Sequence, residues 1–513
     1  MAIYEAIEAD TRFKIALVFG SLAILGSLVS WLFSRPPLGK NAPQLAGHSY
    51  PLLGALQFFT QRWDFIQAAS AHSSTGNFSF HAGKWPVVYV SGKSEANRKL
   101  FFENKGLGFG AGYRALLGGS PDIQKDNNVL SGSVTDADDF DQLFVRRIGA
   151  MLKGPQLKAN LPKLLADVRR SMDALATGKE GITNPFDSVY RMVYQLTMRT
   201  VGCNDFADDD VLLDKSLHLF EVIEQTGTPL SIMWPWIPVP ARAKRLYAGF
   251  QLYMMFKKVV DERAATGKQD DDALQFMMGQ GDDLSTIIQN VVGALFAGQL
   301  NSGINAAWIL IYMTSKPEWF VKVRDEVESV ANKYAPDSTE PLKERLMKVP
   351  MEGWDHDFPV IDLCLRESIR LQLFGTAFRR NVTNQPIPLD PEGKEVIPPG
   401  QYASMSISDF HHNNDIYNNE TEWDPSRYLP DRAEDKKEAY AYAGWGMGRH
   451  PCLGMRFAKL ENNMLVSFFL AYFDEITLAD RNGNDTATLP RVNRNSPTAA
   501  KPLDPIWLKY KVK

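Results

Sequence analysis

The sequence predicts a mainly α-helical protein with a small β-rich part, preceded by an N-terminal transmembrane helix. Three observations support this fold class. Apolar residues at helical spacing dominate the middle of the chain, as in 157–175 and 247–263. Residues 77–92 are rich in β-branched and aromatic side chains and contain turn residues, which is typical of a β-hairpin. Near the N-terminus, residues 15–33 form a run of 19 positions without a charged side chain.

The uncharged run at 15–33 has nearly the length of about 20 residues that an α-helix needs to cross a bilayer. A cleaved signal peptide and a buried helix are the alternatives, but signal peptides usually have a shorter apolar core and a small-residue cleavage site. Pro36 and Pro37 would end the helix. We therefore expect a membrane anchor at 1–34 and a proline-containing linker at 35–40. Basic residues flank the run almost equally, so they do not set its orientation.

Size and charge restrict the function further. A chain of 513 residues exceeds the roughly 250–300 at which one core usually stops growing, so length alone predicts several domains. The net charge of −4 and the lack of a basic stripe argue against nucleic-acid binding. Three cysteines are too few for a disulfide framework and indicate a reducing compartment. We expect Cys203 and Cys364 to be ordinary core residues.

The third cysteine, Cys452, lies in a glycine-rich segment, residues 445–454, with the sequence WGMGRHPCLG. A thiolate that binds an iron needs a backbone folded tightly around it, and glycine permits such turns beside a flat macrocycle. A lone cysteine among glycines could also be a nucleophile or a small buried residue in a turn. These residues alone leave the three possibilities open.

The wider pattern resembles the haem-binding signature of the cytochrome P450 family. The segment reads Trp445-x-x-Gly-x-x-x-Cys-x-Gly, with Trp445 where the family more often has Phe. The resemblance covers roughly residue 41 to the C-terminus and implies a haem b cofactor and the P450 fold, a large helical domain with a small β-rich lobe. The haem-thiolate catalytic domain would then span 41–513. Four further segments resemble family motifs in the expected order: 297–302, Glu-x-x-Arg at 367–370, 398–400 and Pro-x-Arg at 425–428.

The resemblance implies roles in haem binding for four residues. Cys452 would be the axial ligand of the haem iron, and Gly446 would let the loop pass close to the haem. His450 and Arg380 would contact the haem propionates, since cationic and polar donors pair with carboxylates. Arg379, the neighbour of Arg380, could take its place.

Glu367 and Arg370 lie at i and i+3, on one face of a predicted helix. An isolated pair of this kind is usually an exposed salt bridge of about 0–1 kcal/mol. The resemblance implies instead a buried network that includes Arg427 and braces the ligand loop. This role is structural.

The segment 291–305 departs from the family pattern. Most monooxygenases of the family place an acid and then a threonine after Ala-Gly-x, whereas this chain has Leu300 and Asn301. Leucine cannot relay a proton, and an amide orients water without titrating. Asn301, Ser302 and Gln299 would then hold a water chain that delivers protons in a hydroxylase. Alternatively, the enzyme is a haem-thiolate isomerase or dehydratase that acts on an already oxygenated substrate. We favour monooxygenation.

The chain is similar to fungal microsomal members related to the sterol-oxidising branches. This implies insertion of one oxygen atom from O₂ into a lipophilic substrate such as a terpenoid, steroid or prenylated alkaloid. Electrons would come from a separate NADPH-cytochrome reductase, because no flavin or nicotinamide module fits in the sequence. The resemblance also implies a single-pass protein of the endoplasmic reticulum membrane with a cytosolic catalytic domain. A non-catalytic haem-binding protein is the alternative from another class, but no output module is visible.

Two further segments carry expectations. Residues 234–240 are apolar and proline-rich, so they cannot form a regular helix. They form either a packed loop or a substrate-entrance loop at the membrane surface, with Arg242, Lys244 and Arg245 near lipid headgroups. The mixed-charge run 431–438 is interpreted as a solvated loop.

Overall fold

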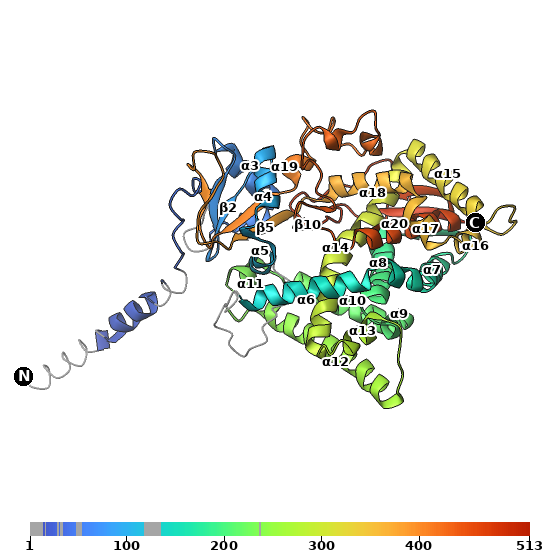
Figure 1. Ribbon diagram of the computed structural model, residues 1–513, viewed down its shortest axis with the longest axis horizontal. Coiled ribbons are helices and arrows are strands. Elements are labelled where there is room, and N and C mark those ends of the chain that lie inside the picture. Colours follow the sequence, from blue (N-terminus) through green and yellow to red (C-terminus); the bar gives the residue numbers. More distant parts are fainter. Residues whose placement is uncertain are drawn as a thin grey trace, which may run out of the picture.

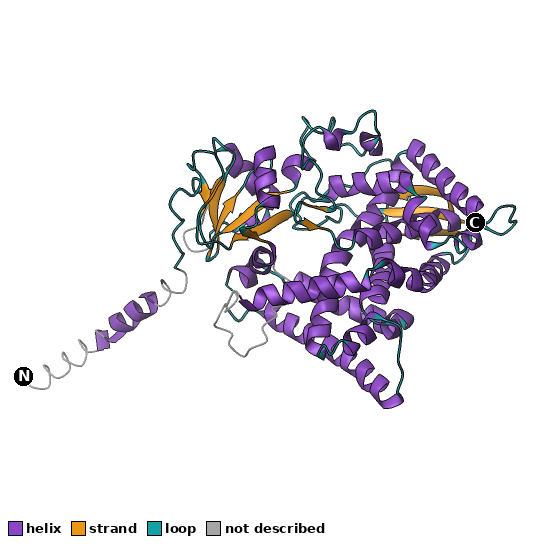
Figure 2. Cartoon of the chain, in the orientation of Figure 1, coloured by secondary structure: helices purple, strands orange, loops and turns teal. Residues whose placement is uncertain are grey.

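The computed structural model describes residues 14–15, 17–27, 30, 34–47, 54–116, 135–234 and 237–513. A large helical body adjoins a smaller part that holds most of the strands, and the N-terminal helix projects away from both (Figures 1 and 2). This arrangement confirms the predicted mainly α fold with a small β-rich lobe.

The small lobe is built on a five-stranded sheet in the order β1-β2-β8-β5-β3. The predicted hairpin is present, with Ala82 opposite Trp85 at its turn. Phe78 and Phe80 pack against Phe58 and Phe65 of the helices on one face. The strands are β1 (Phe78–Ala82), β2 (Trp85–Tyr89), β3 (Leu107–Gly108), β5 (Thr376–Asn381) and β8 (Tyr402–Ser406), and the lobe also contains α2 (Gln57–Thr60), α3 (Arg62–Ala71), α4 (Glu95–Glu103) and α5 (Phe109–Leu116).

The helical body contains most of the core. Its long helices are α6 (Thr135–Met151), α7 (Gly154–Leu175), α8 (Pro185–Val201), α10 (Asp210–Gln225), α12 (Pro240–Thr266), α14 (Leu284–Ser315), α15 (Pro317–Tyr334), α18 (Pro359–Gln372) and α20 (Met455–Tyr472). Shorter helices are α9 (Asn204–Asp208), α11 (Pro229–Met233), α13 (Ala273–Gly279), α16 (Leu342–Leu346), α17 (Met351–His356) and α19 (Ser408–His411), with 3₁₀ turns at Pro425–Tyr428 and Glu434–Lys436.

Small sheets complete the fold. One has the order β11-β12-β4 and joins the C-terminal end of the chain to the helical body. The remaining strands form two hairpins. Their bounds are β4 (Glu180–Thr183), β11 (Phe473–Ala479) and β12 (Trp507–Val512) for the sheet, and β6 (Ile387–Pro388) with β7 (Val396–Ile397) and β9 (Gly446–Met447) with β10 (His450–Pro451) for the hairpins.

Helix α14 runs through the helical body and packs against α8, α18 and α20. The side chain of Asp283 caps its first turn by accepting a hydrogen bond from the N–H of Thr286 at 2.7 Å. Pro317 begins the next helix, two residues after α14 ends at Ser315. The helix is apolar on nearly all sides because it is surrounded by the core.

Within the described ranges, α14 is the only helix that is both long and apolar enough to span a membrane, and 78% of its most apolar window is buried in the core. A shorter apolar helix, Leu17–Ser27, lies in the exposed N-terminal segment. The predicted membrane span at 15–33 lies only partly inside the described residues, since 16, 28–29 and 31–33 fall outside them.

The predicted entrance loop also lies only partly inside the described residues, because 235 and 236 fall outside them. Trp234 is buried, as in a packed loop. Arg242, Lys244 and Arg245 belong to the first turns of α12 rather than to the loop.

Candidate active site: the glycine-rich cysteine loop

The loop around Cys452 is a tight hairpin that leads into α20. Strands β9 and β10 pair, with Met447 opposite His450 and Gly446 opposite Pro451. The N–H of Cys452 donates to the carbonyl of Trp445 at 2.7 Å. Helix α20 begins three residues after the cysteine. The hairpin and the helix together fix the backbone on both sides of the thiol.

Two glycines make this hairpin possible. Gly446 and Gly448 have φ angles of +71° and +58°, which L side chains rarely adopt. A Cβ atom on Gly446 would lie 2.4 Å from the carbonyl oxygen of His450 and 3.0 Å from the nitrogen of Cys452. A Cβ on Gly448 would lie 2.6 Å from the carbonyl oxygen of Phe102. Both positions therefore require glycine, for conformation and for space.

The thiol of Cys452 has a polarised environment. Desolvation by the surrounding loop raises its pKa, and the backbone N–H groups of Gly454 and Met455, which hydrogen-bond to the sulfur, offset only part of that rise. These donors belong to the N-terminal end of α20, where the helix dipole also favours negative charge. The side chain is exposed, unlike the buried Cys203 and Cys364. If a metal bound this sulfur and displaced its proton, the two N–H groups at the helix terminus would donate to the resulting thiolate.

Cationic and polar groups gather beside the loop. Arg379 is 3% exposed, and its guanidinium contacts the ring of Phe109 and the phenol of Tyr113. His450 stacks on the same Phe109 ring, with centroids 4.8 Å apart. Burial, Arg379 and Arg449 together lower the pKa of His450 to about 4, so its imidazole is neutral near pH 7.

Arg379 has no carboxylate partner in the part of the chain that the structure describes. Burial lowers its pKa, and the nearby Arg449 lowers it further. A buried cation of this kind calls for an anion. The propionates of a haem would supply that charge, and Arg379 is placed to receive one.

Arg380 lies on the opposite face of β5 from Arg379, because successive side chains of a strand alternate. Its Nε donates to the carbonyl of Gly400 at 3.0 Å, and its guanidinium lies over the ring of Tyr402. The structure thus brings Arg379, and not Arg380, to His450.

The donor set fits a haem. Cys452 supplies a thiolate ligand. Gly446 has no side chain, so nothing at this position collides with the facing strand of the hairpin. His450 and Arg379 supply hydrogen-bond donors for carboxylates. A thiolate-ligated haem supplies O₂ activation when it is bound.

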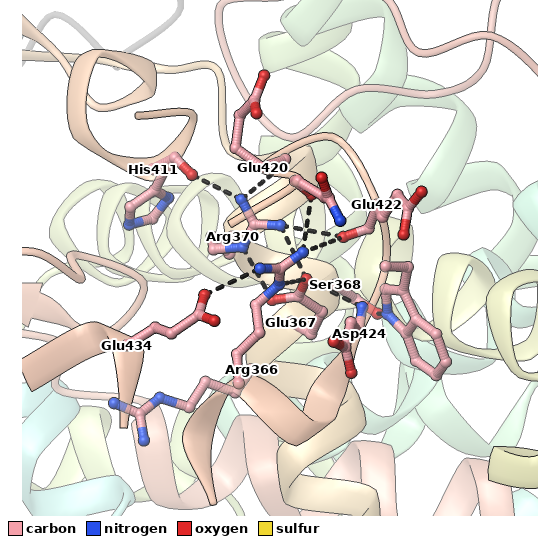
Figure 3. Close-up of polar contacts among 12 residues, drawn as sticks. Arg366, Glu367, Ser368, Arg370, His411, Glu420, Glu422, Asp424 and Glu434 are labelled. Carbon is pink, nitrogen blue, oxygen red and sulfur yellow. Dashed lines mark hydrogen bonds and ion pairs between the residues drawn. The ribbon is translucent and has the colours of Figure 1, made fainter. Parts of the chain in front are cut away.

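Glu367, Arg370 and Arg427 meet in the core and are almost completely buried. Figure 3 shows Glu367 and Arg370 side by side at the centre of this network. Arg370 binds both carboxylate oxygens of Glu367, at 2.8 Å each. Arg427 Nε donates to Glu367 Oε1 at 3.0 Å, and the hydroxyl of Tyr428 donates to Oε2 at 3.0 Å. The N–H of Asp424 completes the set at 3.1 Å. The carboxylate therefore joins α18 to the 3₁₀ turn at Pro425–Tyr428.

Two members of this network carried no signal in the sequence. Glu434 accepts from Arg427 Nη1 at 2.9 Å and is 2% exposed. The interpretation of 431–438 as a solvated loop is therefore wrong at Glu434, because its charge is used inside the network. Its sequence neighbours are mixed in charge and resemble any surface run, so only the long-range partner distinguishes it.

His411 is the second such residue, and it connects the network to the ligand loop. Its carbonyl accepts from Arg370 Nη1 at 2.6 Å. Its ring Nε2 accepts from the N–H of Ala443 at 2.9 Å, and the carbonyl of Ala443 in turn accepts from the N–H of Gly446 at 3.0 Å. Burial and the charge of Arg370 lower the pKa of His411 to about 3, which keeps this nitrogen free to accept. Arg370 is thus linked by successive hydrogen bonds to Gly446.

The three predicted relay residues of α14 do not face the same way. Gln299 is fully buried and donates to the carbonyl of Tyr190 on α8 at 2.7 Å. The hydroxyl of Ser302 interacts with the carboxyl of Glu461 on α20. Asn301 is exposed and donates to the carbonyl of Ala297, one turn earlier, at 3.1 Å. Ser302 and Gln299 therefore point into the core, and Asn301 points toward accessible space.

Comparisons with known proteins find relatives over most of the chain. A family model described as Cytochrome P450 matches residues 47–499. The chain is 32% identical over 503 residues to the cytochrome P450 monooxygenase AacuE of Aspergillus aculeatus, covering 96% of this chain and 98% of that protein. It is 32% identical over 467 residues to the cytochrome P450 monooxygenase nsrP of Aspergillus novofumigatus, covering 88% and 87% of the two chains.

More distant proteins match as well. The sterol 14-demethylase of Arabidopsis thaliana is 28% identical over 277 residues, which is 52% of this chain and 54% of that protein. The solved structure of a cyanobacterial protein, CYP120A1 with bound retinoic acid, matches with a TM-score of 0.69 at 20% identity, over 93% of this chain and 100% of that chain. This last likeness concerns the fold alone.

Proposed function

The chain belongs to the cytochrome P450 family of haem-dependent oxidoreductases, and we propose that it inserts one oxygen atom from O₂ into a lipophilic secondary metabolite. A terpenoid, a steroid or a prenylated alkaloid is the substrate class that we propose. The relatives named as fungal monooxygenases support oxygen insertion over isomerisation or dehydration.

One observation carries this proposal: the accessible thiol of Cys452 lies in a glycine-enforced hairpin, with backbone N–H groups directed at the sulfur. In the proposed site, Cys452 is the axial ligand of the haem iron. Arg379, in place of the expected Arg380, and His450 bind the propionates. Glu367, Arg370 and Arg427 hold the ligand loop in place through His411.

We propose that the protein is anchored in the endoplasmic reticulum membrane by residues 1–34, with 35–40 as linker and 41–513 as the cytosolic catalytic domain. A separate NADPH-cytochrome reductase would supply the electrons.

Three large side chains on the N-terminal half of α12 support a membrane-facing entrance for lipophilic substrates: Leu246, Tyr247 and Phe250 are 66%, 64% and 58% exposed. Such side chains gather where a surface meets a lipid or a protein.

The experiment compares, by accurate mass, metabolites of the native host with and without the gene, grown under isotopically labelled O₂. We expect the compound that vanishes to exceed the accumulating compound by one oxygen atom, and that atom to carry the label. If the two compounds are isomers, or if the added oxygen is unlabelled, the enzyme rearranges or hydrates its substrate and oxygen insertion is refuted.

A further inference from the structure

Arg62, the first residue of α3, carries a buried positive charge that no carboxylate of the described residues neutralises. Its side chain is 4% exposed. The guanidinium Nε donates to the carbonyl of Phe58 at 3.0 Å, whereas Nη1 is buried and has no hydrogen-bond partner among the same residues. The group lies over the rings of Phe58 and Phe378, 4.7 Å and 5.7 Å from their centroids. One hydrogen bond and two aromatic faces therefore surround a full positive charge.

A buried cation in such a place is costly, because neither water nor an opposite charge compensates it. Aromatic faces attract a cation, but they carry no net charge. Burial lowers the pKa of Arg62 to about 10, and the phenol of Tyr113 offsets only part of that fall. The guanidinium is still a cation near pH 7. Its charge and its free Nη1 both favour the binding of an anionic oxygen.

Aromatic rings connect Arg62 with the ligand loop. The ring of Tyr113, on α5, meets Phe378 edge-on, with centroids 5.5 Å apart. Tyr113 also contacts Phe109 at a centroid distance of 4.6 Å, and Phe109 stacks on His450 of the loop. These rings offer an apolar surface between the loop and the cation. A ligand with an apolar body and one anionic group matches both features.

The start of α3 is fixed by Asn495, from the C-terminal part of the chain. The side-chain oxygen of Asn495 accepts from the N–H groups of Trp63 and Asp64 at 2.9 and 3.3 Å. Its amide donates to the carboxylate of Asp64 at 2.9 Å. These backbone donors thus have an acceptor already, and the free donor at this helix end is the Arg62 side chain. A fixed backbone is what a specific binding group requires.

The position of Arg62 differs from that of the groups assigned to the haem propionates. Arg379 and His450 both contact the ring of Phe109. Arg62 packs instead on Phe378, whose side chain points to the opposite face of β5 from that of Arg379, because successive side chains of a strand alternate. The charge of Arg62 therefore needs an anion of its own.

We propose that Arg62 binds the ionised acidic group of the substrate, with the hydroxyl of Tyr113 as a second donor, so that the substrate is a lipophilic acid. The inference rests on the proposed function and narrows its substrate class to members that carry an acidic group. A carboxylate would accept from Nη1 and pair with the charge of Arg62. Donors from Arg379 and the backbone of Phe378 face the Tyr113 oxygen, which leaves the phenol proton for such an acceptor.

The test titrates the full-length holoenzyme with dodecanoic acid and with its methyl ester, and follows the shift of the haem absorption band. The two probes share the chain and differ in charge. We expect wild type to bind the acid roughly 10-fold or more tightly than the ester. Arg62→Gln should bind the acid on the order of 10- to 100-fold more weakly than wild type and the ester equally well. Tyr113→Phe should also weaken binding of the acid alone.

Arg494→Gln is the matched control, because Arg494 is an exposed cation over the ring of Trp63, the neighbour of Arg62. It should bind both probes as wild type does. Equal affinity of wild type for acid and ester overturns the proposal, and this comparison does not depend on the folding of any variant. An equal loss of both probes in Arg62→Gln overturns it as well, since the role is then structural. Release of haem from Arg62→Gln to apomyoglobin as fast as from Arg379→Ala would assign Arg62 to a propionate and overturn it too.

The native substrate gives a test that is independent of these probes. The compound that accumulates in the host without the gene should be retained by an anion exchanger at pH 7 and should lose that retention after methylation. A neutral accumulating compound overturns the inference. Labelled O₂ separates the two proposals: a labelled product from a neutral substrate refutes this inference alone, whereas an unlabelled product from an acidic substrate refutes only the proposed oxygen insertion.

Discussion

Replacing Glu367 with glutamine removes the charge at the centre of the bracing network while keeping the shape of the side chain. The carboxylate is fully buried and accepts hydrogen bonds from Arg370, Arg427, Tyr428 and the backbone of Asp424. An amide offers one oxygen in place of two, and its NH₂ group would face a guanidinium. Arg427 would keep the Glu434 carboxylate, which also pairs with Arg432, whereas Arg370 would lose the one carboxylate that it contacts among the described residues.

Breaking a buried ion pair by removing one partner costs about 3–5 kcal/mol, which is a factor of roughly 160 to 4,700 in the folding equilibrium. This is a large part of the roughly 5–15 kcal/mol by which proteins are stable. Because Arg370 is linked through His411 and Ala443 to Gly446, we also expect haem to be lost from the variant.

The assay compares the denaturant midpoint and the haem content of purified wild type, Glu367→Gln and the control Glu352→Gln. Glu352 forms an exposed ion pair with Lys158 at 2.8 Å, so its replacement should leave both quantities unchanged. We expect a clear fall in midpoint and haem content for Glu367→Gln only. Equal behaviour of the two variants would refute the bracing role.

Three other perturbations have defined outcomes. Gly446→Ala should abolish haem loading, because its Cβ would lie 2.4 Å from the carbonyl oxygen of the facing strand. Gly393→Ala is the control, since Gly393 has a similar φ of +65° and open space around it, and it should load haem normally. Haem content is measured as the pyridine haemochrome. Arg379→Ala should lose the proposed charged hydrogen bond to a haem propionate, worth about 1.5–3 kcal/mol, and should release haem faster to apomyoglobin. Arg380→Ala should release haem at the wild-type rate. If Arg380→Ala releases haem faster than Arg379→Ala, the assignment is contradicted. The pKa of Glu461 is raised from 4.5 to about 8, so the stability that its protonated form contributes is fully present below pH 4.5 and is lost as pH rises to about 8. Glu461→Gln should therefore lose stability less steeply than wild type across that window in denaturant titrations, and parallel curves would contradict the shift.

Local patterns predicted a large part of this molecule. Helical periodicity, the hairpin at 77–92 and the Cys452 loop are features of neighbouring residues, and the structure has the expected helices and hairpin. Residue spacing also pointed to Glu367 and Arg370 because one helix turn brings them together.

Long-range partners could not be predicted in this way. Glu434 lies in an ordinary mixed-charge run, and its contacts with the N–H of Asn418 and the buried guanidinium of Arg427 make it a core residue. The choice between Arg379 and Arg380 depends on which face of β5 turns toward the loop, and a shift of one residue reverses it. Glu461 lies in the predicted helix after the Cys452 loop, and its sequence neighbours do not indicate that it is buried. Its burial beside Ser302 arises from the packing of α20 against α14.

The most direct test of the central claim is the carbon monoxide difference spectrum of the reduced protein, recorded for wild type and for Cys452→Ser at matched haem content. Wild type should show the red-shifted band of a haem with a thiolate ligand, and Cys452→Ser should lose it. If Cys452→Ser retains that band, another residue binds the iron, and the assignment of the glycine-rich loop as the haem ligand is contradicted.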